Sequence, residues 1–198
     1  VLDPLWLGGP IIPILISALL LSLTLSLLTM FMLTSEGVRR LKGQPTAGWT
    51  FGLSIGSMLV VRLIYRLFEA TSDSVGFIVS GFGWQSLLFG ALLATIVPWS
   101  LAIISSWQGW HALEGRRFKP ALKAMLLHTM LLVTIAFGLV WPFTLLMIPP
   151  AILWGQKQAD TIWLQSGLSP RMKQEWTRLQ RTGISTGVRS VNVGEESE

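Results

Sequence analysis

The sequence is poor in the residues that soluble enzymes and disulfide-bonded proteins depend on. It has no cysteine, two histidines and one tyrosine, and only 13% of its 198 residues are charged. Without cysteine there is no disulfide framework, no thiolate nucleophile and no cysteine-ligated metal or iron–sulfur cluster. A soluble domain carries roughly twice this charged fraction. The composition therefore excludes a water-soluble enzyme domain and a disordered tail protein.

Apolar residues fill long stretches of the chain that carry no charge. The sequence is 51% hydrophobic with a mean hydropathy of +0.58, and charges are absent between Asp3 and Glu36, Lys42 and Arg62, Asp73 and Glu114, and Lys123 and Lys157. A helix needs about 20 apolar residues to cross a bilayer, and backbone groups in lipid must be paired within the segment. We therefore predict an all-α integral membrane protein with about four transmembrane helices, at residues 10–34, 47–69, 78–106 and 120–141.

A shift of 72 residues aligns the chain with itself. The pattern G-x-x-x-L-x-G occurs as GVRRLKG at 37–43 and as GWHALEG at 109–115. This predicts two tandem helical hairpins, at residues 1–72 and 73–155. Gly52 and Gly56 add a G-x-x-x-G motif in the second predicted span, and small residues at this spacing let helices approach closely.

Basic residues concentrate in the two loops that share this pattern. Loop 35–46 carries Arg39 and Arg40, and loop 108–119 carries Arg116 and Arg117. The positive-inside rule places both loops on the cytoplasmic side, in a bacterial inner membrane or an equivalent one. These four arginines are candidate contacts for lipid headgroups, an anion or a partner protein.

Two further arginines, Arg62 and Arg66, lie one helical turn apart near the end of the second predicted span, with Glu69 three residues after Arg66. Side chains of this length can extend to the headgroups from near a helix end. A charge within a span also suggests a lipid phosphate, an anionic ligand or a partner carboxylate as its contact. Both interpretations stay open for this pair.

The region after the fourth span is divided. Residues 142–154, PFTLLMIPPAILW, are apolar but too short to cross a membrane, and Pro149 and Pro150 are expected to break them. Three arrangements stay open for this segment: it is re-entrant, it lies in the membrane interface, or it rests against a partner. The side of the membrane that holds the tail stays open as well. The tail, 156–198, is polar and basic. Within it, residues 169–182 predict an amphipathic helix for a membrane surface or a partner protein, whose apolar stripe includes Met172, Trp176 and Leu179.

Few residues suggest chemistry. His128 lies about two turns into the fourth span, where an imidazole can ligate haem iron or chlorophyll magnesium, or can hydrogen-bond to a neighbouring helix. A bis-histidine haem needs a second histidine at similar depth, and His111 lies in a loop. No catalytic constellation, phosphate loop or metal-binding motif is readable. We predict no enzyme activity, no metal site, no nucleic-acid partner, and no cofactor except a haem or pigment on His128.

Three functions remain open. The first is an accessory or structural subunit of a multi-subunit membrane complex, with a respiratory or photosynthetic complex as a host, whose partners are other membrane subunits and lipids. The second is a small homo-oligomeric transporter or channel. The third is a haem- or pigment-binding protein that uses His128.

Overall fold

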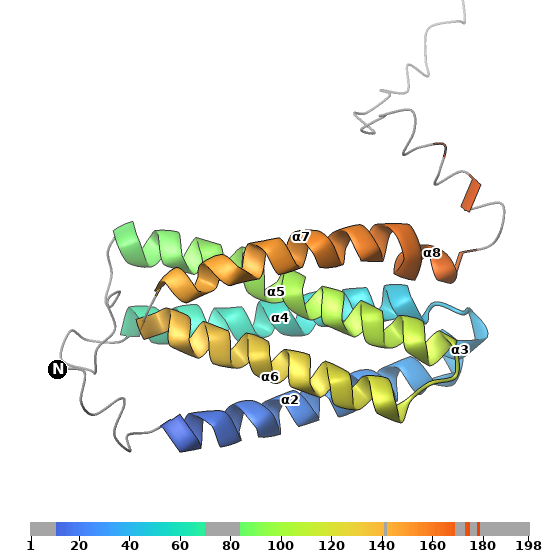
Figure 1. Ribbon diagram of the computed structural model, residues 1–198, viewed down its shortest axis with the longest axis horizontal. Coiled ribbons are helices and arrows are strands. Elements are labelled where there is room, and N and C mark those ends of the chain that lie inside the picture. Colours follow the sequence, from blue (N-terminus) through green and yellow to red (C-terminus); the bar gives the residue numbers. More distant parts are fainter. Residues whose placement is uncertain (1–10, 70–83, 141, 169–172, 175–177, 179–198) are drawn as a thin grey trace, which may run out of the picture. The chain divides into compact units, whose positions relative to one another are not determined.

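The computed structural model describes residues 11–69, 84–140, 142–168, 173–174 and 178, and these contain helices and no strand. Residues up to Gly167 form one compact unit, and a second unit begins at Leu168. In order, the elements are α2 (Ile11–Thr34), α3 (Glu36–Arg40), α4 (Gln44–Glu69), α5 (Trp84–Leu113), α6 (Phe118–Val140), the 3₁₀ helix η1 (Pro142–Met147), α7 (Ile148–Gln158), the π-helical turn η2 (Ala159–Trp163) and α8 (Leu164–Ser166) (Figure 1).

For the described residues, the prediction of an all-helical fold is confirmed. Among the described residues, four helices are long and apolar enough to cross a membrane, at Leu15–Thr34, Gln44–Tyr65, Ser86–Leu113 and Phe118–Gly138. Each overlaps one predicted span. The third differs most at its end, because α5 continues to Leu113 and takes up the first part of the predicted loop 108–119.

The long helices pack in two close pairs. α4 lies along α5, and α2 lies along α6 (Figure 1). Each pair joins one helix from each predicted hairpin, so the two hairpins interlock in one bundle. The duplication itself stays a prediction.

Three glycines bring the backbones of α4 and α5 into direct contact. They recur every four residues along one face of α4: Gly48, Gly52 and Gly56. A Cβ atom added at Gly52 would lie 2.5 Å from the carbonyl oxygen of Leu101. A Cβ atom added at Gly48 would likewise meet the backbone of Ser105, and one added at Gly56 would meet Pro98. Only glycine leaves room for this approach, and this repeat extends the predicted G-x-x-x-G motif by one turn.

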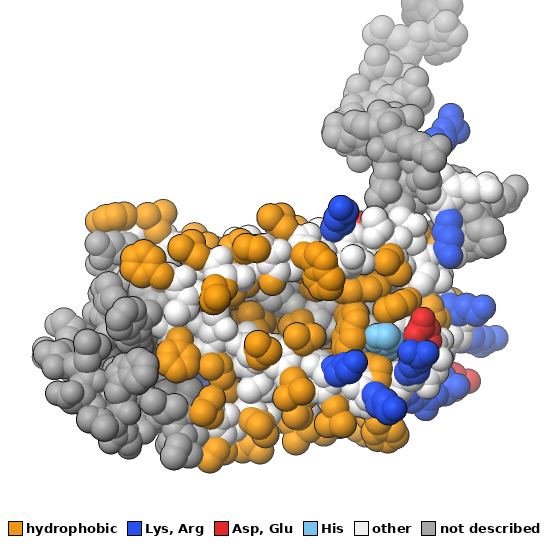
Figure 2. Space-filling model, in the orientation of Figure 1, with side chains coloured by type: hydrophobic (Ala, Val, Ile, Leu, Met, Phe, Trp, Pro, Cys, Tyr) orange, Lys and Arg blue, Asp and Glu red, His pale blue; other side chains and the backbone are white. Residues whose placement is uncertain are grey.

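An apolar core fills the bundle beside this contact. Its buried members come from all the long helices, η1 and α7: Leu25, Val60, Phe89, Leu93, Ile96, Val97, Leu101, Leu131, Ile135, Leu145 and Ile148. Many other large apolar side chains lie on the outer surface (Figure 2). Exposed apolar side chains around a bundle of this kind suit contact with lipid or with other membrane helices.

The segment after α6 turns back along the bundle. Leu145 of η1 is buried against Gly138, where an added Cβ would lie 2.5 Å from its side chain. Pro149 and Pro150 occupy the first turn of α7 and therefore begin this helix, where proline is tolerated, rather than break it. The helical turns continue past Trp154 to Ser166. The predicted apolar segment 142–154 is thus the first part of a longer helical passage, residues 142–166, which we call the return passage.

The close approach of α4 and α5 predicts a specific intolerance to one methyl group. Gly52→Ala places that group against backbone atoms that cannot move aside, and we expect it to lower the free energy of unfolding by about 1–3 kcal/mol. Gly90→Ala is the matched control, because Gly90 is buried on α5 but an added Cβ would lie 3.7 Å from Ile64, an ordinary contact. We expect this control to be neutral, or to gain up to about 1 kcal/mol from helix propensity. Unfolding in mixed micelles measures both variants, and equal losses would contradict the backbone contact.

Candidate functional site

Buried polar side chains concentrate in the part of the bundle that leads toward the basic loops. They lie on α2, α4, α5 and α6: Ser22, Ser26, Thr29, Gln44, Ser100, Ser105, Ser106, Gln108 and His128. Ser86, near the start of α5, is the exception. Among the described side chains, no Asp, Glu, Lys or Arg is buried. This part of the interior is therefore polar but uncharged.

Two of these side chains connect separate helices. Ser26 on α2 donates a hydrogen bond to the carbonyl oxygen of Ala121 on α6, at 2.6 Å. Gln108 on α5 donates from Nε2 to the carbonyl oxygen of Ser26, at 3.1 Å. Hydrogen bonds between apolar helices contribute about 0.6–2 kcal/mol each. They hold α2 in place, although its outer face is mostly exposed.

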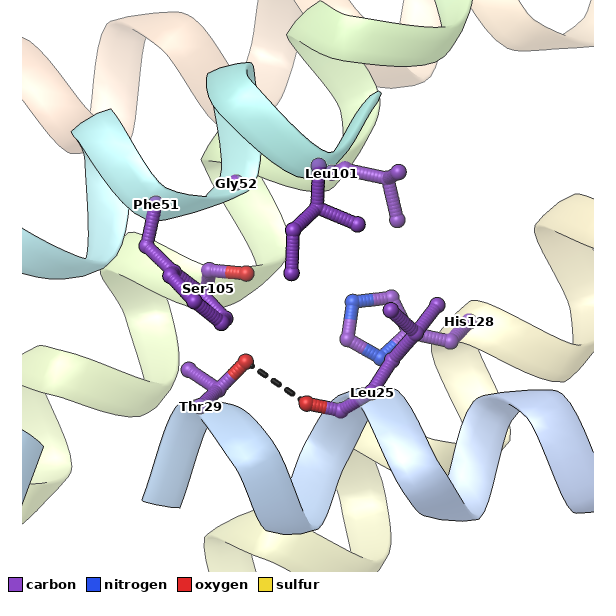
Figure 3. Close-up of a pocket in the computed structure, with 8 residues that line it drawn as sticks. Leu25, Thr29, Phe51, Gly52, Leu101, Ser105 and His128 are labelled. Atoms are coloured by element: carbon purple, nitrogen blue, oxygen red, sulfur yellow. Dashed lines mark hydrogen bonds between the residues drawn. The ribbon is translucent and has the colours of Figure 1, made fainter. Parts of the chain in front are cut away.

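His128 lines a small space between the four long helices (Figure 3). The other lining residues are Leu25, Thr29, Phe51, Gly52, Ile55, Leu101 and Ser105. The His128 side chain is 1% exposed. Within the described residues, its Nδ1 atom has no hydrogen-bond partner.

The space that the structure shows beside His128 is small. Pockets that hold ligands of drug size or larger measure roughly 300–1,000 Å³, well above this space. Gly52 and Leu101, which line it, belong to the backbone contact that joins α4 to α5, so the space cannot widen without separating these helices. In the part of the chain that the structure describes, no group of three His, Asp or Glu side chains is placed to hold a metal ion. A haem or pigment on His128 stays a prediction.

The basic loops meet at one end of the bundle, which we call the basic end. Arg39 and Arg40 are exposed on α3, and Arg116 and Arg117 are exposed between α5 and α6 (Figure 2). The two connections turn in different ways, because the left-handed residue is Lys42 (φ 52°) in the first and Gly115 (φ 81°) in the second. The structure thus brings together four of the six predicted arginine contacts.

The other predicted contacts are separate from this end. Arg62 is exposed on α4, about 27 Å along the helix from Gln44. Arg66 lies in the next turn of α4, but its side chain is not among those described. The apolar stripe predicted for the tail also lies outside the described residues: Met172, Trp176 and Leu179.

The return passage carries a polar network that sequence patterns did not predict. Trp99 on α5 donates from Nε1 to Oε1 of Gln156 on α7, at 2.9 Å. Gln156 donates from Nε2 to Oδ2 of Asp160, at 2.9 Å, and Gln165 donates to the Asp160 carbonyl oxygen, at 2.7 Å. The i, i+4 spacing of Gln156 and Asp160 was the available signal. These bonds pair the polar groups of α7 and η2 and let both elements pack on α5.

The passage ends at the basic end of the bundle. Trp163 of η2 is buried and stacks on Trp110 of α5, with ring centroids 6.5 Å apart. An added Cβ on Gly167 would meet the carbonyl oxygen of Lys42, between α3 and α4. The chain leaves α6 at the opposite end and returns along α5 (Figure 1). Gly167, the last residue of the first unit, therefore lies at the same end as the basic loops.

Comparison of the chain with protein-family models, with curated proteins and with solved structures finds no match. The functional argument therefore depends on the residues and their geometry.

The return passage predicts which positions share one side of a membrane. Because the chain has no cysteine, single cysteines at Lys42, Arg116 and Lys173 can be labelled cleanly. Lys173 is the sixth residue after Gly167, and six residues are too few to cross a core about 30 Å thick. We expect an impermeant maleimide to label all three from one side of sealed vesicles, and to label a cysteine at Ser72, between α4 and α5, from the other side. Labelling of Lys173→Cys together with Ser72→Cys would contradict the return of the chain.

Proposed function

We propose that this protein is a structural, accessory subunit of a multi-subunit membrane complex, in a bacterial inner membrane or an equivalent one. It supplies helix surfaces for assembly and does not carry out catalysis. Its partners are other membrane protein subunits and lipids. The basic end faces the cytoplasm in this proposal, in agreement with the positive-inside rule.

The observation that carries the proposal is the closed interior of the bundle. The backbones of α4 and α5 touch at three glycines, and the apolar core continues from this contact to η1 and α7. A transporter needs a polar path between repeats or between helices. Here the polar part of the interior lies toward the basic end, while the core beyond it is apolar. Such a body suits a fixed scaffold better than a moving one.

The position of the charges supports the same proposal. An anion transporter would direct an arginine toward its path, whereas Arg62 is exposed on the outside of α4. The arginines of the basic end also lie on the surface, where they can contact headgroups or the acidic residues of a partner. The exposed face of α2 presents a row of large apolar side chains for lipid or a neighbouring helix: Leu15, Ile16, Leu19, Leu20, Leu23, Leu27 and Phe31.

Native mass spectrometry of the protein, extracted from its own membrane in mild detergent, tests this function. We expect a mass well above 21.9 kDa that includes other polypeptides. A change on the exposed face of α2, Leu20→Ala with Leu27→Ala, should reduce the recovered complex. The control Ser54→Ala, an exposed position on α4 whose hydroxyl bonds to its own helix, should not.

The other outcomes discriminate between the functions that the sequence left open. A pure homo-oligomer whose reconstituted flux falls in Arg62→Gln would indicate a transporter and overturn the proposal. A monomer with bound lipid and no other polypeptide would overturn it as well. Recovery of partners with both the α2 variant and its control would keep the subunit role but move the contact surface away from α2.

A further inference from the structure

The outer face of α6 changes from basic to apolar along its length. Large apolar side chains are exposed on this face at intervals of four or seven residues, which places them on one side of the helix: Phe118, Leu122, Leu126, Met130 and Phe137. Lys119 and Lys123 are exposed beside the first of these, one helical turn apart and about 6 Å along the axis. Both lysines belong to the segment Phe118–Gly138, which is long and apolar enough to cross a membrane. One helix face thus carries two positive charges near the basic end and an apolar surface beyond them (Figure 2).

These charges have no acidic partner in the part of the chain that the structure describes. Neither lysine forms an ion pair there, and neither do Arg116 and Arg117, which precede them in the connection from α5. Glu114, the nearest acidic residue in the sequence, contacts His111 instead, with 3.3 Å between its Oε2 atom and Nδ1. A lysine near the end of a membrane span extends its ammonium group to the level of the lipid headgroups. The counter-charge for these cations therefore comes from outside the described residues.

The apolar part of the face indicates what kind of anion supplies that charge. From Lys123 to Phe137 the face extends about 21 Å along the helix, which exceeds the roughly 15 Å that one leaflet contributes to a hydrocarbon core about 30 Å thick. A free phosphate ion would contact the cations alone, and a soluble acidic protein would leave the apolar side chains uncovered. A phospholipid of net negative charge matches both parts of the face.

We propose that the outer face of α6 is a binding site for an anionic phospholipid. Lys119 and Lys123 contact its phosphate, and its acyl chains lie along Leu122, Leu126 and Met130. This inference rests on the membrane placement in the proposed function and narrows its lipid partner to one charge class and one site. It does not depend on the subunit role, so a test on the purified chain can fail without affecting that role.

Fluorescence quenching by brominated lipids in reconstituted vesicles tests the site directly. Because the chain has no cysteine, Leu126→Cys can carry a single bimane fluorophore on the apolar part of the face. The vesicles contain equal amounts of phosphatidylglycerol and phosphatidylcholine, with bromine on the acyl chains of one lipid or the other. A lysine near an anionic lipid surface contributes about fivefold in affinity, so we expect the brominated anionic lipid to quench at least about twofold more strongly. At Ser54→Cys, an exposed control position on α4, the two lipids should quench equally.

Two matched variants in the Leu126→Cys chain identify the charge as the cause. Lys119→Gln with Lys123→Gln should abolish the preference, whereas Lys119→Arg with Lys123→Arg keeps both charges and should retain it. Equal quenching by the two lipids at Leu126→Cys, or an equal loss of preference in both double variants, would overturn the proposal. Either result would favour an acidic membrane protein as the occupant of this face. Helical circular dichroism checks that each variant is folded, and if a double variant fails, the single changes at Lys123 are compared by the same criteria.

Discussion

Direct contact between the backbones of α4 and α5 is the constraint on which the rest of the bundle depends. Apolar helices in lipid gain little from the hydrophobic effect, so close packing must hold them together. Glycines at every fourth position of α4 remove the side chains that would separate the helices. Because α4 and α5 belong to different predicted hairpins, this single contact also interlocks the two halves of the chain, and the pairing of α2 with α6 reinforces it.

The positions of the other elements follow from this contact. α5 also receives α7, where an added Cβ on Gly155 would come close to the Ile103 side chain. The return passage then carries the chain back to the basic end. In the proposed orientation, this return lets residues rich in Lys and Arg follow four apolar helices in agreement with the positive-inside rule.

The sequence predicted what depends on composition and missed what depends on contacts between distant residues. The charge-free stretches predicted four long helices, and Gly52 with Gly56 predicted close packing. The partner helix of these glycines was not predictable, because any apolar helix could have filled that role. The passage through Gln156 and Asp160 was missed because its polar side chains are paired only after α7 has docked on α5. The space beside His128 likewise depends on four helices, and the sequence predicted only that its imidazole lies in a span.

The most direct test of this account asks whether contacts across the two hairpins hold the bundle. A protease site inserted between α4 and α5, within residues 70–83, allows the folded protein to be cut in mild detergent. The account predicts that the two halves stay together as one particle after cleavage, because both close helix pairs cross the cut. Native mass spectrometry would show the intact mass with the covalent chain broken. Separation of the halves on cleavage would contradict the interlocked bundle and leave two independent hairpins.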